Sequence, residues 1–184
     1  MSTGLIIGII VIALLVLSAI VWWMSSRKTK TEHLQERFGS EYERAMSSTG
    51  KRSEAERELA ERERRVEKLH IRELDAGDRQ NFSAEWQAVQ GRFVDSPAQA
   101  VREADGLVQK VMDRRGYPVS DFEQMAADVS VQHGGVVRNY RAAHAIAESA
   151  DDDLASTEDL RQAMIHYRAL FADLLGEAVG AAQR

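Results

Sequence analysis

The stretch FSAEWQAVQGRFVDSPAQAVREADGLVQKVMDRRGYP, residues 82–118, contains the clearest helical signals in this chain of 184 residues. Its apolar side chains recur every three or four residues, the spacing that places them on one face of a helix. On the first helix these are Phe82, Trp86, Val89 and Phe93, and on the second they are Ala100, Ala104, Leu107 and Val111. Ser96 before Pro97 is typical of a helix start, and Gly116 followed by Pro118 is typical of a helix end. The stretch therefore predicts two successive helices that each present an apolar side to a core.

Helical signals continue from this stretch to the C-terminus. Ser120 and Glu123 have the spacing of a capping box, in which two side chains bond to free N–H groups at the start of a helix. Ser156 and Asp159 mark the start of another helix, and no stretch alternates between apolar and polar residues as a strand would. We therefore expect residues 78–184 to form an all-α bundle of four or five helices.

A long uncharged segment lies near the other end of the chain. Residues 5–24 include no charged side chain over twenty positions. A helix of that length extends about 30 Å, enough to span the hydrocarbon core of a bilayer. Trp22 and Trp23 close the segment, and indole rings favour the lipid–water boundary. Because the short tail, residues 1–4, has no basic side chain, we expect a retained transmembrane helix at 5–24 rather than a signal peptide.

Basic residues directly after this segment predict its orientation. Arg27, Lys28 and Lys30 follow the segment and no basic residue precedes it, and such residues tend to stay on the cytoplasmic side. We therefore expect a single-pass protein of a bacterial inner membrane, with its N-terminus outside and its C-terminal domain in the cytoplasm. The three basic side chains are candidate contacts for lipid headgroups. The absence of cysteine agrees with a reducing compartment.

Residues 25–77 are expected to form a basic juxtamembrane segment followed by a charged helical stalk. Leu34, Phe38 and Tyr42 recur at intervals of four and form a narrow apolar stripe. Two alternatives remain for this stripe, namely docking to a partner or second copy and packing on the protein's own body. Over residues 53–69 the charges are dense and the apolar seam is thin, which favours a solvated arm over a short coiled-coil contact.

The titratable residues contain no catalytic or metal-binding motif. The five histidines are scattered, and no zinc-binding spacing, phosphate-binding loop, dinucleotide fingerprint or nucleophile motif occurs. We therefore expect no catalytic residue, cofactor, metal or small-molecule ligand. His144 lies on an apolar helix face and His166 at the margin of another, so a site formed by both with a carboxylate remains a minor alternative. The net charge of −5 argues against nucleic-acid binding.

One loop residue suggests a binding role. Tyr117 lies between Gly116 and Pro118, where the chain leaves a predicted helix. Its side chain is a candidate anchor for a partner, because tyrosine offers a large contact area at low entropic cost. The alternative is that Tyr117 folds back and covers the core at the helix end.

Five blocks of the sequence resemble those of an uncharacterised family of small bacterial membrane-anchored proteins. The blocks are ERFGSEYER (36–44), FSAEWQAVQGRFVDSPAQAVREAD (82–105), RRGYPVSDFEQ (114–124), NYRAAHAIAE (139–148) and LRQAMIHYRALFADLL (160–175). The resemblance covers most of the chain after the predicted anchor and implies a single-pass helical architecture. It implies no reaction, because no activity, cofactor or catalytic residue is known for that family.

Together these features predict a membrane-tethered helical adaptor or scaffold that binds other proteins. A body held on an anchor raises the local concentration of its partner at the membrane surface. The alternatives are a self-associating structural component of the envelope and, in third place, an enzyme with a polar site inside the bundle.

Overall fold

The computed structural model describes residues 17–18, 31–151 and 154–176, and every structural statement below concerns these residues. Several predicted features fall outside them: the membrane span at 5–24 apart from positions 17 and 18, the tryptophans Trp22 and Trp23, and the basic residues Arg27, Lys28 and Lys30. Within the described part of the chain, no helix is both long enough and apolar enough to cross a membrane.

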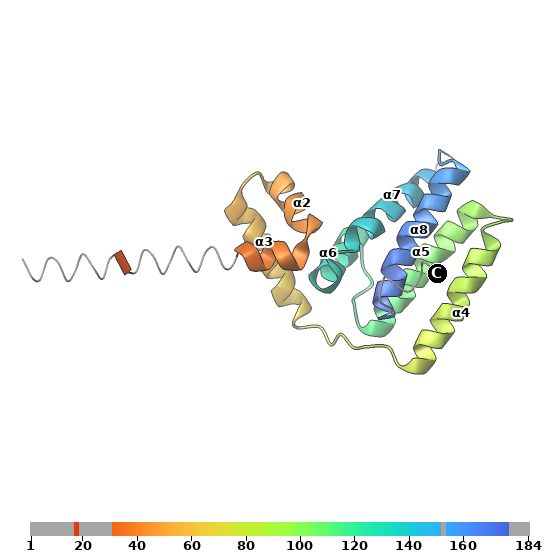
Figure 1. Ribbon diagram of the computed structural model, residues 1–184, viewed down its shortest axis with the longest axis horizontal. Helices are drawn as coiled ribbons and strands as arrows, with labels where there is room; N and C mark the ends of the chain where they lie inside the picture. Colours follow the sequence, from red (N-terminus) through yellow and green to blue (C-terminus); the bar gives the residue numbers. More distant parts are fainter. Residues whose placement is uncertain (1–16, 19–30, 152–153, 177–184) are drawn as a thin grey trace, which may run out of the picture.

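All regular structure in the described residues is helical, which confirms the predicted all-α class. Residues 31–38 are helical, and they are followed by α2 (Ser40–Thr49), α3 (Arg52–Val66), α4 (Ala76–Arg92), α5 (Pro97–Arg115), α6 (Phe122–His133), α7 (Val137–Asp151) and α8 (Thr157–Leu174). Figure 1 shows α2 and α3 at one end of the molecule, connected to α4 by an extended segment. In the bundle of α4 to α8, α8 packs on both α7 and α5, and α4 packs on α5.

The ends of two bundle helices agree with the sequence signals. Helix α5 begins at Pro97 and stops before Gly116, whose φ of 96° is a left-handed conformation that glycine adopts readily. The Ser96 side chain makes no capping hydrogen bond, so proline marks this start without help from the serine hydroxyl. Helix α8 begins with the expected reciprocal hydrogen bonds between Ser156 and Asp159.

The predicted start of α6 is wrong by one residue. Asp121 rather than Ser120 caps the helix, and its carboxylate accepts a hydrogen bond from the Gln124 backbone N–H at 3.0 Å. Aspartate caps helices at least as well as serine, so the second of two adjacent capping residues takes the role here. Glu123 therefore lies at the second helical position and is free to bond elsewhere.

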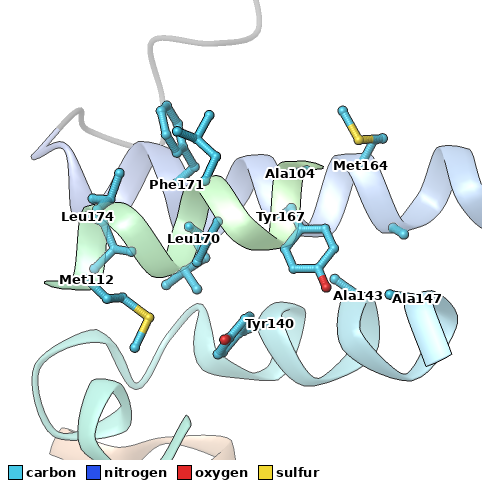
Figure 2. Close-up of a cluster of buried hydrophobic side chains, with 14 of the residues drawn as sticks. Ala104, Met112, Tyr140, Ala143, Ala147, Met164, Tyr167, Leu170, Phe171 and Leu174 are labelled. Atoms are coloured by element: carbon cyan, nitrogen blue, oxygen red, sulfur yellow. The ribbon is translucent and has the colours of Figure 1, made fainter. Parts of the chain in front are cut away.

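The bundle core is filled by side chains from all five helices. Figure 2 shows Tyr140 and Ala143 of α7 facing Tyr167 of α8, with small side chains beside large ones. One turn further along α8, Trp86 of α4 stacks on Phe171 with 4.7 Å between ring centroids. The aromatic face predicted for α4 is therefore the one that joins this helix to the bundle.

The solvated arm predicted within residues 25–77 is wrong, because its apolar residues form a second core. Residues 31–38, α2 and α3 pack together and bury Leu34, Phe38, Tyr42, Ala45, Ala55, Leu59 and Val66, with Val131 of α6. The break at Gly39, where φ is 51°, separates the helical residues 31–38 from α2 and lets α2 change direction. The apolar stripe of Leu34, Phe38 and Tyr42 and the apolar seam of α3 thus cover each other. We call residues 31–69 the N-terminal unit.

Buried charges join the N-terminal unit to the bundle. Glu41 of α2 is only 2% exposed, and its carboxylate accepts hydrogen bonds from Arg62 of α3 at 3.2 Å and Arg141 of α7 at 2.9 Å. Asp128 of α6 is also buried and accepts a hydrogen bond from Arg65 of α3 at 2.8 Å. These ion pairs fix the N-terminal unit against α6 and α7.

A close backbone approach at Gly134 gives a first prediction. A Cβ atom at this position would lie 2.6 Å from the Arg37 carbonyl oxygen and 3.1 Å from the Ser130 carbonyl oxygen. Because backbone atoms cannot move aside cheaply, we expect Gly134→Ala to lower the free energy of unfolding by about 1–3 kcal/mol in a denaturant titration. Gly135→Ala is the matched control, since its Cβ meets nothing within 4 Å. Equal effects of the two substitutions would contradict this packing.

Candidate functional site

Three helices bring a group of polar side chains into the bundle interior. Asp105 projects from α5, Tyr140 and His144 project from successive turns of α7, and Tyr167 projects from α8. The two tyrosines are fully buried, with their ring centroids 6.3 Å apart (Figure 2). We call these four residues the polar cluster, a group with a carboxyl, two phenols and an imidazole.

Hydrogen bonding within the polar cluster is incomplete. The Oδ2 atom of Asp105 accepts a hydrogen bond from the Gln109 side chain at 2.6 Å. Asp105 Oδ1, the Tyr140 and Tyr167 hydroxyls and His144 Nδ1 are all buried and make no well-formed hydrogen bond with a described residue, although the Tyr167 hydroxyl lies close enough to Asp105 to act on its carboxyl. Unpaired buried polar atoms are rare in folded proteins, so four of them in one group distinguish this part of the core.

Burial changes the acidity of the cluster. It raises the pKa of the Asp105 carboxyl, an effect that the nearby Tyr167 hydroxyl and His144 partly offset. Burial also raises the pKa of Tyr140 and of Tyr167, and the nearby Asp105 carboxyl raises both further. The surroundings therefore favour the uncharged form of each of these three groups.

His144 connects this interior to the protein surface. Its ring stacks on Phe122 with 3.6 Å between centroids, while Nε2 lies 3.7 Å from a carboxylate oxygen of the exposed Glu148. The side chain also lines a surface groove of about 420 Å³, together with Arg44 and Arg141. Nδ1 of His144 is thus buried in the interior, whereas Nε2 lies on the side of the groove.

A second histidine, His133, pairs with a carboxylate as a catalytic histidine would, but its contacts serve to join helices. His133 Nδ1 forms a short contact with the Asp173 carboxylate, and its Nε2 lies 3.0 Å from the Arg115 guanidinium. Since a guanidinium only donates hydrogen bonds, Nε2 must accept, and the Nδ1–H donates to Asp173. Both nitrogens are occupied, and Arg115 also donates to the Leu174 carbonyl oxygen at 3.1 Å. This cluster ties α5, α6 and α8 together.

The structure places the predicted partner-binding residues in the interior. Leu34, Phe38 and Tyr42 are at most 5% exposed, so packing on the protein's own body is the alternative that the structure shows. Tyr117 is 1% exposed, and its hydroxyl donates a hydrogen bond to Gln132 Oε1 at 2.9 Å. Burial raises its pKa to about 12. None of the four offers the exposed surface that docking requires, because each covers the end or side of a core.

Of the two histidines in the minor alternative, the structure brings only His144 close to the polar cluster. His166 is half-buried and makes no hydrogen bond or ion pair with another described residue, whereas Asp105, Tyr140 and Tyr167 are the groups that approach His144. A signal for Asp105 exists in the sequence, because it lies four residues after Val101 and three before Val108, both fully buried. The two tyrosines have the spacing of ordinary core residues, so no sequence pattern distinguishes them from the rest of the core.

The described residues contain no group of three or more histidine, cysteine, aspartate or glutamate side chains arranged to hold a metal ion. A comparison with protein families, curated proteins and solved structures finds no match to this chain. The resemblance to a membrane-anchored family stays a prediction, and the functional argument rests on the geometry alone.

Proposed function

We propose that the protein is a membrane-tethered helical adaptor that binds another protein at the cytoplasmic surface of a bacterial inner membrane. The predicted anchor at 5–24 leads into residues 31–38, whose apolar side is buried in the N-terminal unit. Because that unit is joined to the bundle through Glu41 and Asp128, a bound partner would be held at a defined position close to the bilayer. A flexible stalk would not do this.

The observation that carries the proposal is a charged groove between residues 31–38 and α3. It has a volume of about 1070 Å³, and Gln35, Arg57, Glu61 and Arg64 are among the side chains that line it. Small-molecule sites are mostly apolar and enclosed, whereas this groove is lined by long side chains of both charges. Such a surface suits a protein segment of complementary mixed charge, for which electrostatics sets the register and the choice of partner.

Site-specific crosslinking in cells tests this proposal. A photoreactive residue replaces Arg64 in the groove of the full-length chain, and a matched variant carries it at Arg168, an exposed arginine of α8. We expect one heterologous protein to crosslink reproducibly from position 64 and not from position 168. Crosslinks between copies of the chain alone would favour the self-associating envelope component instead. The absence of any protein crosslink at position 64 would overturn the groove as a docking site.

The proposed topology has its own test. A reporter that is active only outside the cytoplasm, fused after Arg184, should be inactive, because the basic residues after the predicted span hold the body inside. The same reporter fused before Met1 provides the positive control. Activity of the C-terminal fusion would place the body on the other side of the membrane.

A further inference from the structure

We propose that the polar cluster is a proton-binding site, in which Asp105 takes up one proton and thereby makes the packing of α5, α7 and α8 depend on pH. This inference goes beyond partner binding and stands independently of it. The ligand is a single proton, which is small enough to bind between close-packed side chains. Figure 2 shows Tyr140 and Tyr167 of the polar cluster among the side chains of the bundle core.

The position of the carboxyl is the first step of the argument. Asp105 Oδ1 is buried and makes no well-formed hydrogen bond with a described residue, the Tyr140 hydroxyl is unpaired among these residues, and the Tyr167 hydroxyl lies close to the Asp105 carboxyl. An ionised carboxylate loses the solvation of its charge in such a place, whereas a protonated carboxyl loses much less. As an acid, Asp105 also gains an O–H donor that a phenol oxygen can accept. Protonation therefore removes a buried charge and adds a donor where acceptors lie unpaired.

Among the described residues, the lysines and arginines around the cluster do not pair with Asp105. On α7, Arg141 donates to Glu41 at 2.9 Å and to Glu123 at 2.7 Å, so its charge is already balanced. On α5 itself, Asp105 accepts a hydrogen bond from the neutral Gln109, and Arg102, three residues earlier, is exposed.

Within the part of the chain that the structure describes, no lysine or arginine of the other packed elements pairs with the carboxyl either. Helix α4 pairs with α5 through Arg92–Glu103 and Lys110–Glu85, and both α5 positions lie on another side of the helix from Asp105. Helix α8 presents Tyr167, and the first residue of α6, Phe122, covers Tyr140 and His144. The acidic Glu148 lies on the outer side of His144 and adds negative charge. His144 thus lies between the cluster and the groove.

The sign of the pH effect follows from linkage. A carboxyl whose pKa is higher in the folded than in the unfolded chain holds its proton only in the folded state over the interval between the two values. The stability that this proton contributes is complete below the unfolded pKa, about 3.9 for aspartate, and is lost as the pH rises through the folded pKa. The wild-type chain should therefore become easier to unfold, relative to a variant that cannot ionise here, as the pH rises.

Denaturant unfolding of the full-length chain in mild detergent, from about pH 4 to pH 8, tests the proposal. Asp105→Asn keeps the size and polarity of the side chain but cannot ionise, and Asp113→Asn, at an exposed position of the same helix, is the matched control. Between the unfolded and the folded pKa of Asp105, the unfolding constant of the wild type should rise relative to that of Asp105→Asn by up to tenfold per pH unit, which is the slope for one proton. Asp113→Asn should follow the wild type. Parallel profiles for wild type and Asp105→Asn would overturn the proposal.

Two further measurements keep the test decisive if Asp105→Asn does not fold. The wild type should show an infrared carbonyl band of a protonated carboxylic acid that persists above the pH at which ordinary aspartates ionise. Tyr167→Phe should shift the loss of that band to higher pH, because the phenol stabilises the ionised form of Asp105. Ionisation of every carboxyl at ordinary pH, or no shift of the band in Tyr167→Phe, would contradict a proton site at this position.

Discussion

Glu41→Ala is expected to lower the free energy of unfolding by about 3–5 kcal/mol, the largest loss for any single charged side chain described here. Glu41 is 2% exposed and is the shared acceptor of Arg62 and Arg141, whose side chains are 13% and 12% exposed. Without the carboxylate, the two guanidinium groups lose their shared buried acceptor and keep only the more exposed carboxylates of Glu58 and Glu123. Denaturant titration of the full-length chain in mild detergent measures the effect.

The control for this substitution lies two residues further along α2. Glu43 is exposed and its side chain makes no ion pair with a described residue, so Glu43→Ala removes the same charge and should change stability by no more than about 0.5 kcal/mol. In a double-mutant cycle, Arg141→Ala should cost less in the Glu41→Ala background than in the wild type, because the two residues share one network. Additive losses would show that Glu41 and Arg141 act separately and that the buried pair does not join α2 to α7.

Leu34→Ala is expected to lower the free energy of unfolding by about 2–5 kcal/mol, the range for truncating a leucine in a packed core. Leu34 is 1% exposed and belongs to the second core, which also includes side chains of α2 and α3 and Val131 of α6. The loss should appear in the denaturation midpoint of the full-length chain. This result would also separate the two alternatives for the apolar stripe.

Leu154→Ala is the matched control, because Leu154 is 78% exposed and loses the same atoms on substitution. It should leave the midpoint nearly unchanged. If the stripe instead serves a partner, Leu34→Ala would preserve the midpoint and reduce the yield of the crosslink from position 64. That outcome would contradict the second core.

Most helix boundaries could be predicted from the properties of the residues at the helix ends. The errors in these predictions also arise from neighbouring residues. Pro97 and Gly116 bound α5 because one has a fixed φ and the other tolerates a positive φ, and both properties belong to the residue itself. At α6, Ser120 and Asp121 are both good caps, and the sequence alone cannot rank two adjacent candidates. At Gly39, the penalty of about 1 kcal/mol for a glycine inside a helix does not determine by itself whether the helix breaks there.

The N-terminal unit was predicted as helices and misjudged as an exposed stalk. The apolar seam of α3 is narrow, and most of its other residues are charged. Such a helix is stable in solution only if its seam is covered, yet its pattern does not say by what. The cover is the stripe of Leu34, Phe38 and Tyr42, which is itself too narrow to identify its partner.

The sequence by itself determined the all-α class, the bundle and its main helix boundaries, because capping, proline geometry and apolar periodicity act within a few residues. Tertiary structure alone decided that the charged helices fold back as a second core and that Glu41 meets Arg141 from a hundred positions away. It also decided that Asp105 shares the interior with Tyr140 and Tyr167, because helix packing brings residues of three separate helices to one place. Local patterns specify which face of a helix is apolar, but only the packed chain specifies what that face meets.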